Sequence, residues 1–247
     1  MNEYSTVSEL PEEEVPHEQI ERFRERYTWA ARRTRGKRIL ECGCGAGQGL
    51  QLLLDQAKGV AAGDYDAAQA ARAAATYPSI DIRTFDAIQL PHDDETFDVV
   101  LLAEAIYYIE ELDVLMSEVR RVLAEDGEFL VVTANKDLYD FNPSPKTFAY
   151  LGTREIRALF QKHKFDLTIV EGGTPLTDVS LRQRILRPLK YVATRLNLIP
   201  RTMSGKSTLK RLFFGGSFEK MPHKFTAPSN PLLVDSLSST EPCTTHK

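Results

Sequence analysis

A glycine-rich loop at residues 43–49 constrains the fold of this chain more than any other feature. It follows a short apolar run, Arg38–Cys42, and it precedes Leu50–Leu54, where helical periodicity begins. Because glycine has no Cβ, the loop backbone can approach a ligand closely, and the helix start behind it favours a carboxylate or a phosphate. The sequence therefore predicts a strand, a ligand-binding turn and a helix in direct succession.

The alternation of strand and helix patterns continues along the chain. Further short strands are predicted at residues 59–63, 80–85, 97–103, 128–133 and 165–170, and helices at residues 67–76, 112–123 and 153–163. Strands that alternate with helices form a doubly wound, mostly parallel α/β sheet. In such sheets ligands bind at the carboxyl ends of the strands, where the glycine loop lies.

Composition narrows the class of protein. The 247 residues are 42% apolar and 27% charged, with a net charge of −4, which is typical of a globular protein. No apolar run approaches the roughly 18 residues of a membrane span, and no basic-then-apolar signal segment opens the chain. The three cysteines include Cys42 and Cys44 but form no disulfide framework or zinc-site pattern. We expect a cytoplasmic protein without a bound metal.

The charges are segregated along the chain. Residues 1–20 hold six glutamates and no Lys or Arg, whereas residues 179–218 hold nine Lys or Arg and no acid. We expect a mobile acidic arm at 1–16, a core at 17–173, a basic helical lid or acceptor region at 174–225 and a disordered tail at 226–247.

The basic stretch leaves several partners open. It fits a solvated helix face, an anionic acceptor, contact with an anionic membrane surface or a nucleic-acid backbone. Nucleic acid is the least favoured of these, because no recognisable RNA-binding or DNA-binding module accompanies the stretch.

Two common nucleotide-binding motifs do not fit the glycine loop. In the dinucleotide fingerprint G-x-G-x-x-G, the last glycine would fall on Gln48 or Leu50. A P-loop is also excluded there, because no Gly-Lys-Ser/Thr closes the loop. A nicotinamide-dependent oxidoreductase is thereby disfavoured.

The loop, read from Glu41 to Gly47, resembles the E-x-G-x-G-x-G signature of class I S-adenosylmethionine-dependent methyltransferases. The resemblance extends to about residue 170 and favours the small-molecule branch, which is similar to methyltransferase type 11. It implies a Rossmann-like fold and S-adenosylmethionine as cofactor. It also implies that Asp64 holds the ribose hydroxyls, that Tyr65 packs on the adenine and that Asp86 with Ala87 reads the adenine amino group. The full implied cofactor set is Glu41, Gly43, Cys44, Gly45, Gly47, Asp64, Tyr65, Asp86, Ala87 and Ala103.

The resemblance is thinner at the catalytic position. Related small-molecule enzymes often place a histidine base after the fourth strand, where this chain has Tyr108, preceded by Tyr107 and Glu104. Those three residues and His92 are the candidate catalytic groups. The tyrosines equally suit packing, and His92 equally suits a loop in contact with solvent.

The acceptor is expected to meet the polar and aromatic loop after the fifth strand. Asn142 and Ser144 of that loop, with Arg182 of the basic stretch, are the candidate acceptor-binding residues. The sequence favours O-methylation of a small-molecule or glycan-type acceptor by in-line displacement at the sulfonium methyl. The alternative is a methyltransferase-like, non-catalytic cofactor-binding subunit that supports a partner.

Overall fold

The computed structural model describes residues 10–138, 141, 143–144, 147–167 and 218–226. Its centre is a five-stranded sheet in the order β4-β3-β2-β5-β6, in which every neighbouring pair is parallel. The strands are β2 (Arg38–Cys42), β3 (Gly59–Asp64), β4 (Asp81–Thr84), β5 (Phe97–Ala103) and β6 (Leu123–Val132). The order reverses between β2 and β5, which is where such sheets bind ligands.

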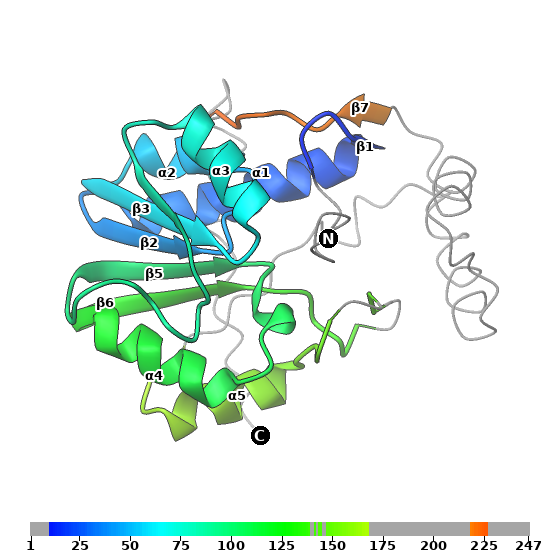
Figure 1. The fold of residues 1–247 in the computed structure, drawn as a ribbon. Helices are drawn as coiled ribbons and strands as arrows, with labels where there is room; N and C mark the ends of the chain where they lie inside the picture. Colours follow the sequence, from blue (N-terminus) through cyan, green and yellow to red (C-terminus); the bar gives the residue numbers. More distant parts are fainter. Residues whose placement is uncertain (1–9, 139–140, 142, 145–146, 168–217, 227–247) are drawn as a thin grey trace.

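Helices cover both faces of this sheet (Figure 1). One face carries α1 (His17–Arg33), α2 (Leu50–Leu54) and α3 (Ala67–Thr76), and the other carries α4 (Leu112–Val122) and α5 (Thr153–Lys162). A short 3-10 helix, η2 (Ile106–Tyr108), follows β5. The prediction of a doubly wound, mostly parallel α/β fold is confirmed.

Local sequence explains the elements beside the glycine loop. The β2 run is buried from Ile39 to Cys42, as expected of a strand covered on both faces. Asp66 begins α3 as its N-cap, where its carboxylate accepts the Ala68 N–H at 2.8 Å. Apolar residues at helical spacing bury one face of α4, including Leu115 and Val119.

Two element predictions differ from the structure. Strand β6 begins at Leu123 rather than at residue 128, so α4 passes directly into it. The strand expected at 165–170 does not appear at Phe165, Asp166 and Leu167, which form no regular element. Phe165 instead packs against Phe129 and Phe160. Residues 168–170 lie outside the described part of the chain.

A second, two-stranded sheet joins distant parts of the sequence. Strand β1 (Glu14–Pro16) pairs antiparallel with β7 (Phe218–Lys220), with Val15 opposite Glu219. The expected arm at 1–16 therefore ends in a strand whose backbone pairs with residues 218–220. The earlier part of the arm, residues 1–9, lies outside the described residues.

The segment after β7 packs into the core. Met221 and Phe225 are fully buried, and the Phe225 ring stacks on Phe23 of α1 with centroids 4.5 Å apart. The Phe225 N–H donates to the Gln48 carbonyl of the glycine loop at 2.9 Å. The region expected as a basic helical lid thus ends, at residues 218–225, in a strand and a core-packing loop. Its remainder lies outside the described residues, as does the tail beyond residue 226. Among the described residues, no helix is long and apolar enough to cross a membrane.

Candidate functional site

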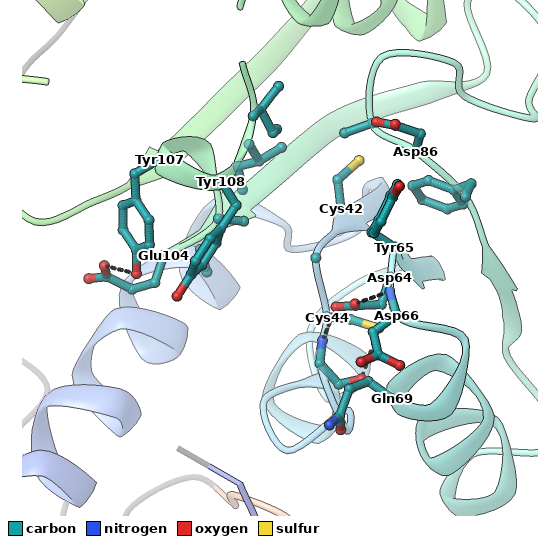
Figure 2. A pocket seen from close by; sticks show the side chains of 18 of the residues that line it. Cys42, Cys44, Asp64, Tyr65, Asp66, Gln69, Asp86, Glu104, Tyr107 and Tyr108 are labelled. Carbon is teal, nitrogen blue, oxygen red and sulfur yellow. Dashed lines mark hydrogen bonds between the residues drawn. The ribbon is translucent and has the colours of Figure 1, made fainter. Parts of the chain in front are cut away.

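A cavity of about 810 Å³ opens at the carboxyl ends of β2, β3 and β5. Residues of the glycine loop, of the turns after β3 and β4, of η2 and of α1 form its walls. The volume lies in the range of small-molecule and cofactor pockets. Figure 2 shows two groups of side chains, with Asp64, Tyr65 and Asp86 on one side and Glu104, Tyr107 and Tyr108 on the other.

The glycine loop turns sharply because Gly43, Gly45 and Gly47 all have positive φ, between 55° and 81°. Its first N–H groups do not face the cavity as a ligand cradle would. The Gly43 and Cys44 N–H groups donate to the Gly63 carbonyl at 2.8 and 3.0 Å. At these two residues the end of β3 therefore uses the backbone donors.

Asp64 stands at the end of β3 and lines the cavity. Its Oδ2 accepts the Gly45 N–H and its Oδ1 accepts the Asp66 N–H, both at 2.8 Å. Burial raises the pKa of this carboxyl, and the two backbone hydrogen bonds oppose that rise. Each oxygen keeps a further lone pair, so the carboxylate can accept two hydroxyls of one ligand.

The remaining cofactor candidates fall into two groups. Tyr65, Asp86, Ala87 and Ala103 line the cavity, as do Gly43, Cys44 and Gly45. Tyr65 is 61% exposed and lines the cavity with an aromatic ring. The Asp86 carboxylate accepts the Ile88 N–H at 3.2 Å.

Glu41, at the end of β2, and Gly47, within the loop, do not line the cavity. Glu41 is fully buried, and its Oε1 accepts the Tyr27 hydroxyl at 2.5 Å. Burial raises the pKa of Glu41 to about 8, although the hydrogen bond from Tyr27 opposes this. In the structure Glu41 joins β2 to α1 rather than facing a ligand.

Glu104, Tyr107 and Tyr108 lie together at the other end of the cavity. Glu104 follows β5 with a left-handed backbone, φ 56°, a conformation that non-glycine residues rarely adopt outside functional or constrained positions. The Tyr107 hydroxyl donates to Glu104 Oε2 at 3.0 Å. Burial, followed by the nearby Glu104 charge, raises the pKa of Tyr107 far above its ordinary value, so its phenol stays protonated.

Arg26 completes this group, and sequence reasoning missed it. Its Nη1 donates to Glu104 Oε1 at 3.0 Å from α1, and both side chains are mostly buried, with 19% and 24% exposed. The apolar spacing of Ile20, Phe23 and Tyr27 could have predicted the helix. No local signal could have paired residues 78 positions apart.

His92 does not belong to the cavity. Its ring packs edge-on between Phe85 and Phe97, with centroids 6.0 and 5.0 Å away. Burial lowers the pKa of His92, and its Nε2 has no hydrogen-bond partner among the described residues. The structure therefore separates His92 from Glu104 and places it in an aromatic packing role.

The acceptor candidates are only partly described. Ser144 does not line the cavity, and its carbonyl accepts the Thr147 hydroxyl at 2.8 Å. Asn142 and Arg182 lie outside the described residues. From the same loop region, Phe148 does reach the cavity. Within the described part of the chain, no cluster of His, Cys, Asp and Glu could hold a metal.

Comparison with known proteins agrees with this fold and loop. A family model described as a methyltransferase domain matches residues 40–131. A probable S-adenosylmethionine-dependent methyltransferase of Mycolicibacterium smegmatis is 38% identical over 133 residues, covering 53% of this chain and 51% of the relative. A fatty-acid O-methyltransferase of the same organism is 34% identical over 106 residues, covering 40% and 38%. The chain spans about half the length of the first curated relatives that it matches.

Solved structures agree on the fold. A SAM-dependent methyltransferase from Archaeoglobus fulgidus superposes with a TM-score of 0.55 at 18% identity, covering 72% of this chain and 87% of the other. The fold is a Rossmann-like α/β domain with a parallel central sheet. Residues 40–131 match the methyltransferase domain, and this match agrees with the predicted resemblance to class I S-adenosylmethionine-dependent methyltransferases.

Proposed function

We propose that this protein transfers the methyl group of S-adenosylmethionine to a hydroxyl oxygen of a small-molecule or glycan-type acceptor. The observation that carries the proposal is the arrangement of one cavity with two chemically different ends. Asp64, Tyr65 and Asp86 suit a nucleoside at one end, and a carboxylate with two tyrosines stands at the other.

The residues present fit the cofactor. Asp64 keeps acceptor capacity for two ribose hydroxyls while Gly45 and Asp66 fix its orientation. Tyr65 offers an exposed ring for the adenine, and Asp86 offers a carboxylate for its amino group. When bound, the cofactor supplies a methyl group already activated on a sulfonium.

The acceptor end contributes orientation and removal of a proton. In the transfer the carbon–sulfur bond breaks with its electron pair retained by sulfur, a carbon–oxygen bond forms, and the acceptor hydroxyl loses its proton. Glu104 is the proposed recipient of that proton, because Tyr107 stays protonated and His92 lies outside the cavity. Tyr107 and Arg26 hold the Glu104 carboxylate in place.

The mycobacterial relatives support a small-molecule acceptor. One is described as a fatty-acid O-methyltransferase, and others as methyltransferases of phthiotriol and phenolphthiotriol dimycocerosates. These descriptions favour oxygen as the atom methylated in at least one relative. These relatives align with this chain over 106 and 101 residues. The acceptor proposed for this chain is therefore argued from the cavity and tested by experiment.

The second candidate is a cofactor-binding subunit without turnover of its own. It is favoured by one observation, since both oxygens of Glu104 already accept hydrogen bonds, from Arg26 and Tyr107. Such a subunit would bind S-adenosylhomocysteine as tightly as an enzyme and would transfer no methyl group.

Two measurements separate these functions. The first is calorimetry with S-adenosylhomocysteine, and the second is the transfer of radiolabelled methyl groups to fractionated cell extract. We expect Asp64→Asn to weaken the binding of S-adenosylhomocysteine by about 1.5–3 kcal/mol, the scale of hydrogen bonds to a charged group. Glu104→Gln should keep cofactor affinity and lose about 100-fold in labelling rate. Asp55→Asn is the matched control, because Asp55 is exposed, lies outside the cavity and, among the described residues, its carboxylate accepts a hydrogen bond from Gln51 one turn earlier.

Unchanged affinity in a folded Asp64→Asn variant would contradict the cofactor assignment. Tight S-adenosylhomocysteine binding without label in any fraction would favour the non-catalytic subunit.

A further inference from the structure

The cavity is strongly acidic among its described lining residues. Its walls carry six carboxylates, Asp64, Asp66, Asp86, Glu104, Glu110 and Glu111, and a single basic side chain, Arg26. The first three lie on the side assigned to the cofactor, and Asp66 also caps α3. Among the described lining residues, the remaining carboxylates therefore set the charge at the acceptor end.

The one lining guanidinium is already engaged. Arg26 donates to Glu104 Oε1 at 3.0 Å, and the two side chains are only 19% and 24% exposed. An acceptor carboxylate or phosphate that formed an ion pair with Arg26 would leave the Glu104 carboxylate without its positively charged partner. Removing one partner of a mostly buried ion pair is costly, because the other charge stays desolvated.

Two exposed acids add to this effect at the mouth. Glu110 and Glu111 follow η2 directly, line the cavity and are exposed. Both carboxylates repel an anion that approaches Tyr108. Salt screens this repulsion only in part, because the separation is shorter than the screening length.

The surface beside these acids is apolar and aromatic. Tyr107 is 8% exposed and its ring lies 4.5 Å from Tyr150 and 4.7 Å from Tyr108, measured between centroids. Phe148 is 56% exposed, lines the cavity and is held to η2 by its N–H, which donates to the Tyr107 carbonyl at 3.0 Å. Ile109 lines the same side. Ligands with rings or aliphatic chains gain the most binding free energy from contact with such an apolar surface.

We propose that the acceptor is an uncharged hydroxyl compound with an apolar skeleton, and that the Arg26–Glu104 pair with Glu110 and Glu111 excludes anionic acceptors. This inference rests on the proposed function, whose acceptor site it specifies. The skeleton lies against Tyr108, Ile109 and Phe148, and the hydroxyl reaches Glu104. A carboxylic acid, such as the acceptor in the name of the fatty-acid relative, is disfavoured here.

The test uses matched probes on the whole 247-residue chain loaded with S-adenosylhomocysteine. Binding of 1-octanol is compared with that of octanoate, and 4-methylphenol with 4-methylbenzoate, by saturation-transfer NMR with titration at pH 7.5 and low salt. The members of each pair differ mainly in charge. We expect each uncharged probe to bind at least about tenfold more tightly than its anion.

Charge reversal at the mouth gives the matched variants. The double variant Glu110→Lys, Glu111→Lys should bring octanoate to within about threefold of 1-octanol, because two repulsive charges become attractive. The control is Glu125→Lys, Asp126→Lys, which makes the same change in net charge at exposed neighbouring acids near the start of β6, outside the cavity. The control should keep the original preference.

The outcomes separate the inference from the proposed function. Failure of S-adenosylhomocysteine to bind, seen in the loading step, would contradict the proposed function. With the cofactor product bound, equal or tighter binding of the anions would overturn the inference. Absence of binding by both uncharged probes, or tighter binding of methyl glucoside than of 1-octanol, would overturn it as well.

Discussion

Gly43, the first residue of the glycine loop, constrains the shape of the loop. Gly43 has φ 81°, and a Cβ placed there would lie 2.8 Å from the Ala105 Cβ. Ala105 lies between Glu104 and η2, so the absence of a side chain at Gly43 lets the loop approach this segment closely. The requirement is both conformational and steric.

We expect Gly43→Ala to lower the free energy of unfolding by about 1–3 kcal/mol, because it adds a left-handed alanine and a clash with backbone-fixed Ala105. Urea denaturation measures this. Gly59→Ala is the control, since a Cβ there meets nothing within 4 Å and its φ is not positive. Equal losses in the two variants would contradict the account of Gly43.

The burial of Glu41 predicts that the stability of the fold depends on pH. Burial raises its folded-state pKa to about 8, whereas the unfolded chain ionises near the ordinary value of 4.5. Between these values the folded state holds a proton that the unfolded state has released. Stability from this group is therefore present at low pH and is lost as pH rises, by up to about 1.4 kcal/mol per unit.

Denaturation of the protein and of Glu41→Gln at pH 5, 6, 7 and 8 checks this. The substitution should flatten the decline in unfolding free energy across that window, because the amide cannot ionise. Parallel pH curves for the two proteins would show that Glu41 titrates alike in both states.

At the scale of elements, α1 links the core to the site. Phe23 stacks on Phe225, Tyr27 bonds Glu41 and Arg26 bonds Glu104, all from one helix. The β1–β7 pair lies beside this helix and ties both flanking segments of the chain to it. The placement of Arg26 thus depends on segments that no local pattern connects.

Phe225→Ala should lower the free energy of unfolding by about 3–5 kcal/mol, since the ring is 1% exposed and fills a core position. In a double-mutant cycle with Phe23→Ala, the double variant should lose less unfolding free energy than the sum of the two single losses, because the rings contact each other. Phe148→Ala, at an exposed ring, should change stability by less than about 0.5 kcal/mol. Additive losses at Phe23 and Phe225 would contradict the stacking.

For the whole molecule, the cavity gathers segments from across the described chain at one edge of the sheet. Hydrogen exchange with and without S-adenosylhomocysteine should show added protection at residues 42–48, 64–66, 85–88 and 103–108, which hold lining residues. Residues 57–60 and 124–127, near the starts of β3 and β6, should stay unchanged. Protection at those starts alone would contradict the placement of the site.

Much of the fold was predictable because its signals are local. The strands at 38–42 and 97–103 and the helix at 67–76 have the predicted bounds, since each depends on side chains within its own run. The expected strand at 165–170 failed at 165–167, where packing of Phe165 on Phe129 prevailed over β propensity. Strands β1 and β7 escaped prediction, because each is stable only beside the other.

The sequence by itself determined the class of fold and predicted the cofactor, because the glycine loop and the acid at Asp64 depend on spacing along one strand–turn–helix unit. Only the tertiary structure decided the acceptor end of the cavity. It brought Arg26 to Glu104 across 78 positions, placed His92 between two phenylalanines and buried Glu41 at the end of β2. Such contacts depend on how helices and strands pack in space. Packing brings together residues that are far apart in the sequence, and no local sequence pattern predicts which residues will meet.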